Sequence, residues 1–258
     1  MTVIVEKKEH VGYITLNRPE VLNALDNETL HDFWGAWAVF GDDPEVWVIL
    51  ITGAGEKAFS VGRDLKKYKE GQGVPKVEHV FEPVCDIGLG HAAKVDKPVI
   101  AAVNGYALGW GFTIVLLTDI RIACENAVFG YPEVTYGLPT GVGSLLLPRD
   151  LSWCRSMEVL LTGDRIGAQE ALRLGLVNRV VPKGEAFPAA ESVARRICEN
   201  GPLAVKATKR MARMGLEMPF ESARQQVETL RYILRQTEDA KEGPRAFAER
   251  RKPRYRGE

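Results

Sequence analysis

Two glycine-containing segments carry the groups that could do chemistry in this 258-residue chain. Gly109 and Gly111 flank Trp110 directly before an apolar run typical of a helix, and Gly62-Arg63 precedes a second helix start. Glycine lets the backbone approach a ligand closely, and the free N–H groups of a helix start stabilise negative charge on an oxygen atom. The alternative is that these glycines only pack a helix against a strand.

Glu133 is the carboxylate that best fits proton transfer. It follows Tyr131-Pro132 in an apolar neighbourhood, where partial desolvation raises the pKa of a carboxyl group toward values useful to an acid–base catalyst. An exposed turn glutamate is the alternative reading of the same segment. The histidines stand in no metal-ligand pattern and no G-x-S-x-G motif follows a strand, so we expect neither a metal site nor a Ser-His-Asp hydrolase.

Each glycine segment follows a run typical of a buried strand. Residues 98–103 form one such run, the Asn104-Gly105 turn comes next, and the apolar residues 112–117 predict a helix. Residues 46–51 form a similar continuous apolar run, and the turn behind it leads to a helix start with Asp64 as its candidate cap. If the two strands are neighbours, the amides of both segments can point at one atom.

The rest of the pattern predicts an α/β core with a helical C-terminal region. Strands are expected at 2–6, 12–16, 119–123 and 127–129, and a helix with Asp26 as N-cap carries an apolar stripe that we assign to the core. A loop is expected at 69–80, with a helix at 84–93 after it. Nearly everything from residue 153 onward is expected to be helical, with the boundary between residues 143 and 164. The predicted C-terminal helices are 153–161, 168–174, 186–199, 203–214 and 220–235.

Composition excludes several classes of protein. Lys+Arg and Asp+Glu both number 34, and this neutral balance argues against a nucleic-acid partner. The four cysteines are widely spaced, as is typical of reduced thiols in a cytosolic enzyme. The N-terminus lacks an apolar signal core and no run is long enough to span a membrane, so we expect a cytoplasmic protein with no membrane partner.

Several ordered motifs together resemble the crotonase superfamily, the enoyl-CoA hydratase/isomerase family. They are N-R-P-E-V-L-N-A-L at 17–25, K-A-F-S-V-G-R-D-L at 57–65, V-N-G-Y-A-L-G-W-G at 103–111, F-G-Y-P-E-V at 129–134, the segment 162–181 and E-G-P-R-A-F-A-E-R-R-K-P at 242–253. The resemblance covers essentially the whole chain.

The resemblance implies a fold of repeated ββα turns wound into a superhelix, with C-terminal helices that build a homotrimer, often a dimer of trimers. Residues 1–150 would form the core with the acyl-CoA site, and residues 151–258 the helical region for oligomerisation, which also covers the site. The implied ligand is a coenzyme A thioester, which is the substrate, and no separate cofactor or metal is implied.

Site residues follow from the same resemblance. The two backbone N–H groups that hold the thioester oxygen map to Arg63 and Trp110. The neighbouring residues Val61, Gly62, Asp64, Leu65 and Gly109 are expected to contact the substrate, and Lys57, Lys66 and Lys67 are candidates for the coenzyme phosphates.

One position departs from the usual family pattern. Typical hydratases of the family hold water between two glutamates; the second maps to Glu133, whereas the first maps to Thr113. A threonine hydroxyl can orient water but cannot act as a carboxylate base near neutral pH. Hydration by two glutamates is therefore not expected here.

Three functions fit a single glutamate. The first is a hydratase-type lyase that uses Glu133 with water held by Thr113. Segments 64–68, 111–113 and 133–139 resemble hydroxycinnamoyl-CoA hydratase-lyases, in which case Tyr68 contacts the acyl end. The second is an isomerase that moves a 3-enoyl double bond to position 2, and the third is an acyl-CoA binding protein without catalysis. We rank the lyase first and the isomerase second.

Overall fold

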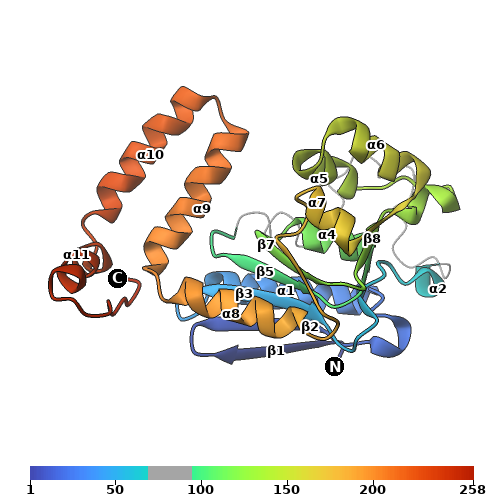
Figure 1. Ribbon diagram of the computed structural model, residues 1–258, viewed down its shortest axis with the longest axis horizontal. Helices are drawn as coiled ribbons and strands as arrows, with labels where there is room; N and C mark the ends of the chain where they lie inside the picture. The colour runs from blue at the N-terminus through green and yellow to red at the C-terminus, as the bar shows by residue number, and fades with distance from the viewer. Residues whose placement is uncertain (69–94) are drawn as a thin grey trace.

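A computed structural model of the chain describes residues 1–68 and 95–258, except the side chain of Tyr68 (Figure 1). The loop expected at 69–80 and the helix expected at 84–93 lie outside the described residues. Within the described part, no helix combines the length and the apolar character that a membrane crossing requires. Cys124, Cys154 and Cys198 carry free thiols.

Among the described residues, the larger of two sheets has six strands in the order β1-β2-β3-β5-β7-β10. Among the described pairings of this sheet, β1 and β2 are antiparallel and the others are parallel. Every residue of β3 and β5 is buried. This confirms the prediction from their continuous apolar runs, which are typical of strands covered on both faces. The strands are β1 (Val3–Lys8), β2 (Val11–Leu16), β3 (Val48–Gly53), β5 (Val99–Val103), β7 (Ile120–Cys124) and β10 (Arg179–Val181).

The smaller sheet has four short strands, β4 (Ala58–Ser60), β6 (Tyr106–Leu108), β8 (Val128–Gly130) and β9 (Arg165–Gly167), in the order β4-β6-β8-β9. From β3 to β8, successive strands alternate between the sheets, so that β3, β5 and β7 are each followed by a strand of the smaller sheet. This alternation gives the repeated ββα turn of a crotonase-like superhelix, which confirms the expected fold class. The sequence pattern alone missed β4 and β6, because three residues are too few to show a period.

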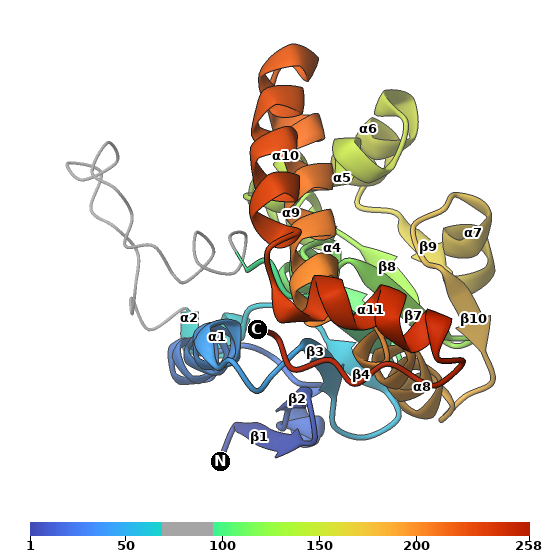
Figure 2. The same ribbon diagram turned by 90° about the vertical axis from the view of Figure 1, so that its left-hand side faces the viewer.

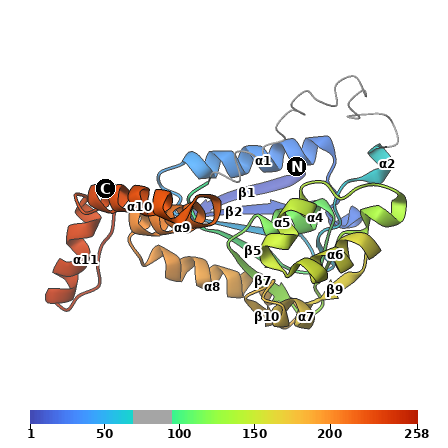
Figure 3. The same cartoon turned by 90° about the horizontal axis from the view of Figure 1, so that it is seen from above.

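Helices cover both faces of the larger sheet. Figure 3 shows α1 (Asn27–Asp42) on one side of β1 and β2, and α8 (Ala186–Cys198) on the other side of the sheet. Alternate residues of the strands face the two helices, as in any pleated sheet. The Asp26 side chain caps α1 by accepting a hydrogen bond from the Thr29 amide, as predicted. The predicted core stripe of α1 is buried; its residues are Leu30, Phe33, Trp34, Trp37 and Phe40.

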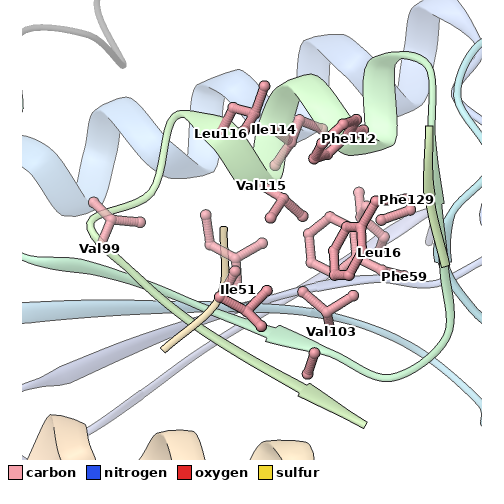
Figure 4. Close-up of a cluster of buried hydrophobic side chains, with 14 of the residues drawn as sticks. Leu16, Ile51, Phe59, Val99, Val103, Phe112, Ile114, Val115, Leu116 and Phe129 are labelled. Atoms are coloured by element: carbon pink, nitrogen blue, oxygen red, sulfur yellow. The ribbon is translucent and has the colours of Figure 1, made fainter. Parts of the chain in front are cut away.

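The main core lies between the two sheets, beneath α4 (Trp110–Leu116). Figure 4 shows Phe112 and Val115 of α4 above side chains from both sheets, among them Val103 of the larger sheet and Phe129 of the smaller. Phe112 and Phe129 are fully buried, with ring centroids 5.5 Å apart. This packing fixes the start of α4 against the smaller sheet.

The chain after residue 150 combines core elements with helices that extend away from it. β9, β10 and α8 join the core, so the expectation of helices almost alone from residue 153 was wrong for the two strands. Helices α9 and α10 run side by side away from the sheets, and α11 lies with the C-terminus near the end where α9 begins and α10 ends (Figures 1 and 2). Besides α8, the helices from residue 143 onward are α5 (Gly143–Asp150), α6 (Trp153–Thr162), α7 (Ala168–Arg173), α9 (Pro202–Glu217), α10 (Phe220–Leu234) and α11 (Glu238–Ala248).

Candidate active site

The two glycine segments lie side by side at the ends of β4 and β6. We call Gly62-Arg63 the first crossing and Gly109-Trp110 the second crossing. β3 and β5, the strands predicted at 46–51 and 98–103, are parallel neighbours, as the expectation required. β4 and β6 are parallel neighbours too, with Ser60 opposite Ala107, so the two crossings lie next to each other. Gly62 and Gly109 have φ angles of +88° and +52°. A Cβ atom on Gly62 would lie 2.8 Å from the Leu108 carbonyl oxygen. Glycine is therefore required here both for its backbone conformation and for the close approach of the two chain segments.

The first crossing leaves one amide open. The Val61 amide donates to Leu22 O at 3.2 Å, and the Asp64 amide donates to Leu25 O at 3.0 Å. The Gly62 amide donates to the Ser60 hydroxyl at 3.2 Å. The Arg63 amide, between them, has no acceptor among the described residues. It is thus free to bind a ligand oxygen.

The second crossing also leaves one amide open. The Gly109 amide donates to Gly130 O at 3.0 Å, and the Gly109 carbonyl accepts from the Thr113 amide at 2.9 Å. Trp110 is the first residue of α4, and its amide finds no acceptor in the described part of the chain. A Cβ atom on Gly62 would lie 3.1 Å from this amide nitrogen, so the two open amides belong to one small region of backbone.

Glu133 stands against the second crossing. It lies in a short 3-10 helix, Pro132–Tyr136, directly after β8. A Cβ atom on Gly109 would be only 2.8 Å from Glu133 Oε1. Its other carboxyl oxygen, Oε2, is buried and has no hydrogen-bond partner among the described residues. Burial raises the pKa of the Glu133 carboxyl, as expected of an acid–base group.

A cavity of about 950 Å³ opens onto both crossings and onto Glu133. Its walls include most of the predicted site residues, and Leu22, Ala24, Leu138 and Arg165 come from other segments. Gly62 is buried and is not part of the wall. The side chain of Tyr68 lies outside the described part of the chain. The predicted residues on the wall are Val61, Arg63, Asp64, Leu65, Lys66, Lys67, Gly109, Trp110 and Glu133.

The charged residues of the first crossing are mostly engaged with the protein itself. Asp64, the candidate helix cap, has its carboxylate 3.2 Å from an Arg18 guanidinium nitrogen. Lys67 Nζ lies 2.5 Å from Asp26 Oδ2. Lys57 is not part of the cavity wall. Lys66 is on the wall and has no acidic partner among the described residues, so it is the remaining candidate for a phosphate contact.

Thr113 lies behind the cavity wall. Its side chain is buried, and the hydroxyl is 3.3 Å from Gly109 O and 3.1 Å from the Tyr131 hydroxyl. The Thr113 hydroxyl, which we expected to hold a water molecule, is therefore hydrogen-bonded to groups of the protein itself. Tyr131, which is fully buried, was missed as a site residue because its pairing with Thr113 joins separate elements that no local pattern connects.

A set of hydrogen bonds from the side chains of Arg18 and Asn23, next to the first crossing, was also missed. Residues 22–25 run alongside residues 61–64, and the Asn23 side chain donates to Ala54 O at 3.0 Å and to Ala58 O at 2.8 Å. Arg18 donates to Ala24 O at 2.7 Å. The motif at 17–25 was the available signal, but spacing alone does not show what its polar residues hold.

Comparisons with known proteins agree with this fold. A family model described as "Enoyl-CoA hydratase/isomerase" matches residues 6–258. The chain is 44% identical over its full length to the "(E)-benzylidenesuccinyl-CoA hydratase" of Thauera aromatica, also covered in full, and 43% identical to the "Carnitinyl-CoA dehydratase" of Escherichia coli K12, with 95% of this chain and 94% of the relative covered. A crystal structure of enoyl-CoA hydratase from Bacillus anthracis superposes with a TM-score of 0.92, at 34% identity and with both chains covered completely.

The chain belongs to the enoyl-CoA hydratase/isomerase family of the crotonase superfamily. It is an enzyme of that family, and an acyl-CoA thioester is the substrate class consistent with this membership.

Proposed function

We propose that this protein is a hydratase-type lyase that adds water to the double bond of an enoyl-CoA thioester, with Glu133 as its single acid–base residue. One observation carries the proposal: Arg63 and Trp110, whose amides have no acceptor among the described residues, line the same cavity as Glu133, whose carboxyl pKa is raised by burial. Two amides match the needs of a thioester oxygen that gains negative charge. A carboxylate beside them matches the proton transfer that accompanies that charge.

The reaction proceeds in two proton transfers. Glu133 takes a proton from water, the resulting hydroxide forms a bond to C3, and the electrons of the C2–C3 double bond move onto the thioester oxygen. The amides of Arg63 and Trp110 stabilise this enolate. Protonated Glu133 then gives its proton to C2, which restores the carbonyl and the free carboxylate. The thioester itself holds the charge, so we propose no cofactor apart from the coenzyme A of the substrate.

The names of the relatives favour water addition over isomerisation. One relative is named a hydratase and the other a dehydratase, which describe the two directions of the same type of reaction. A 3-enoyl-CoA isomerase is the alternative, since one carboxylate beside Gly109 is sufficient to move a proton between carbons. A protein that binds acyl-CoA without turnover is the third reading.

We also propose a homotrimer, or a dimer of trimers. Large apolar side chains are exposed on the three last helices, which extend away from the core and bury little of their surface in one chain. Exposed apolar surface of this kind marks an interaction site. Size-exclusion chromatography with light scattering of the purified protein tests the assembly, and a monomer at micromolar concentration would contradict it. The exposed residues are Leu216, Phe220, Tyr232, Ile233 and Phe247.

Turnover of three thioesters tests the proposed reaction. Crotonyl-CoA, feruloyl-CoA and 3-hexenoyl-CoA are each incubated with the protein while the thioester absorbance is followed. We expect hydration of at least one 2-enoyl thioester, reduced ~10²–10⁴-fold in Glu133→Gln. Glu125→Gln, an exposed glutamate after β7, is the control and should retain full activity.

Each other outcome points to a different function. Turnover of 3-hexenoyl-CoA alone would support the isomerase. Coenzyme A binding without turnover of any thioester would support the binding protein. Full activity in Glu133→Gln would show that Glu133 is not the base.

A further inference from the structure

Two buried hydroxyl groups lie in line behind the second crossing. Tyr131 Oη is 3.1 Å from Thr113 Oγ1, and Thr113 Oγ1 is 3.3 Å from the Gly109 carbonyl oxygen. Neither side chain is part of the cavity wall. Burying a hydroxyl group costs free energy unless it is hydrogen-bonded, and these two hydroxyls are bonded to each other and to the Gly109 carbonyl.

The number of protons fixes the direction of this chain of bonds. A threonine hydroxyl has one proton, and the Gly109 carbonyl can only accept. Thr113 therefore donates to Gly109 O, and Tyr131 donates to Thr113. The sequence of donors runs from the phenol, through the threonine hydroxyl, to the backbone carbonyl.

That carbonyl belongs to the same peptide unit as the open amide of Trp110. The unit is planar and trans, so its C=O and N–H bonds point in opposite directions. Holding the Gly109 carbonyl from behind therefore fixes the direction in which the Trp110 N–H points. The Gly109 amide, held by Gly130 O at 3.0 Å, secures the other side of the same residue.

We propose that Thr113 and Tyr131 are positioning residues that aim and polarise the Trp110 amide toward the thioester oxygen. This inference rests on the proposed function, in which that amide is one of two oxyanion donors. Hydrogen bonds in a chain polarise one another, so donation to the Gly109 carbonyl makes the N–H of the same peptide unit a stronger donor. The threonine thus acts from behind the donor and does not contact the reacting atoms.

Tyr131 is fixed firmly enough for this role and also connects the donor to the base. Its ring is fully buried and lies 4.9 Å from that of Phe112, and a Cβ atom on Gly143 would collide with it. Glu133 follows two residues later in the chain. One hydrogen-bonded pair therefore couples the segment that carries the base to the helix start that carries the donor.

The test measures the thioester carbonyl stretch of bound butanoyl-CoA, which has no double bond to hydrate, by infrared difference spectroscopy. In the unaltered protein the stretch should move to lower wavenumber than in free butanoyl-CoA. Thr113→Val and Tyr131→Phe should each lose part of that displacement, and kcat for the best enoyl-CoA should fall ~3- to 10-fold with little change in KM. Thr113→Ser, which keeps a hydroxyl, should restore both values.

A matched control separates this role from fold damage. Thr118→Val removes another buried hydroxyl near the opposite end of α4, where it donates to Val115 O, and should change neither the stretch nor kcat. Thr113→Val leaves the buried Tyr131 hydroxyl without its partner, whereas Thr113→Val with Tyr131→Phe removes both hydroxyls, so the double variant should recover most of the stability lost in Thr113→Val. A purely structural pair would recover kcat together with stability. The positioning role predicts that kcat stays low.

Two further outcomes are distinguishable. If butanoyl-CoA shows a displaced stretch in the unaltered protein and the same displacement in Thr113→Val and Tyr131→Phe, the positioning role is wrong and the proposed function stands. If the unaltered protein binds butanoyl-CoA with no displacement at all, the oxyanion site itself is wrong, and the positioning role with it.

Discussion

The two crossings each present one open amide, yet they are held in different ways. At the second crossing the peptide before Trp110 is fixed from within the core, by bonds to Gly130 and Thr113 and by the fully buried helix residue Phe112. At the first crossing the Arg63 amide is fixed by the neighbouring segment 22–25, which charged groups at the edge of the cavity hold in turn.

The position of an open amide can therefore be maintained either by packing in the core or by a cluster of charged side chains. Arg18 lies 3.3 Å from Asp26 and 3.2 Å from Asp64, and Lys67 completes the cluster with Asp26. The first amide should therefore respond to pH and to charge-removing substitutions. The second should respond to changes of shape in the core.

Glycine replacement at the crossings should have the largest effect. In Gly62→Ala the new Cβ meets main-chain atoms of the second crossing, whereas in Gly109→Ala it meets the end of the Glu133 side chain. Main-chain atoms cannot move aside easily, so Gly62→Ala should lower kcat ~10²–10³-fold, the loss expected for one oxyanion donor, and should lower stability more than Gly109→Ala. Steady-state kinetics and thermal melting of both variants measure these effects.

Gly35→Ala is the control for these two variants. Gly35 lies in α1, and its added Cβ would meet nothing within 4 Å. This variant should keep full activity and gain slight stability from the higher helix propensity of alanine. Unchanged kcat in Gly62→Ala would show that the two crossings are not held in contact.

Asp26→Asn should loosen the first crossing alone. Burial by itself raises the pKa of the Asp26 carboxyl, but bonds from Lys67 and Thr29 and the nearby Arg18 outweigh it and hold the pKa well below its usual range. Stability from a lowered pKa is present above the unfolded value of about 3.9 and is lost as pH falls through the folded value. The substitution should lower the free energy of unfolding by about 2–3 kcal/mol at pH 7, and by less at pH 3, because it removes one of the negative charges that balance the buried Arg18 guanidinium.

Urea unfolding at both pH values measures this loss, and Asp32→Asn serves as the exposed control on the same helix. An equal loss at pH 7 and pH 3 would indicate that the Asp26 charge does not hold the crossing.

Glu133→Gln should stabilise the protein while it removes activity. Because burial raises the folded pKa of Glu133 above the unfolded value of about 4.3, ionisation of this carboxyl opposes folding at neutral pH, and that penalty disappears as pH falls through the folded pKa. The neutral amide should therefore gain about 1 kcal/mol at pH 7. For the unaltered protein, kcat/KM should fall with decreasing pH at a pH above the ordinary glutamate range. A less stable Glu133→Gln, or an acid limb near pH 4, would place the carboxyl in water.

The smallest expected effect is a difference in KM between variants of two adjacent lysines, Lys66 and Lys67, which follow the first crossing. Lys66→Ala should raise KM for an enoyl-CoA ~2- to 5-fold at low salt, since an exposed charge contributes little to the binding of a phosphate. Lys67 is already paired with Asp26, so Lys67→Ala should leave KM nearer to its original value. The matched enoyl-pantetheine thioester, which lacks the nucleotide phosphates, is the control and should show no KM change in Lys66→Ala. An equal KM change for both thioesters would rule out a phosphate contact.

Sequence patterns predicted the parts of this molecule that depend on local chemistry. The buried runs became β3 and β5, Asp26 became the cap of α1, and the two glycine turns became the crossings. The three-residue strands β4 and β6 were missed because they are too short to show a period. Tyr131–Thr113 and Arg18–Asp64 were missed because these pairs form only once the ββα turns have brought separate segments together.

A crystal structure of the protein with bound butanoyl-CoA tests the central claim most directly. We predict that the thioester oxygen lies within hydrogen-bond distance of the backbone nitrogens of both Arg63 and Trp110, with the Glu133 carboxyl group facing C2 and C3 of the acyl chain. A thioester oxygen bound away from either amide, or a Glu133 side chain turned out of the cavity, would contradict the account.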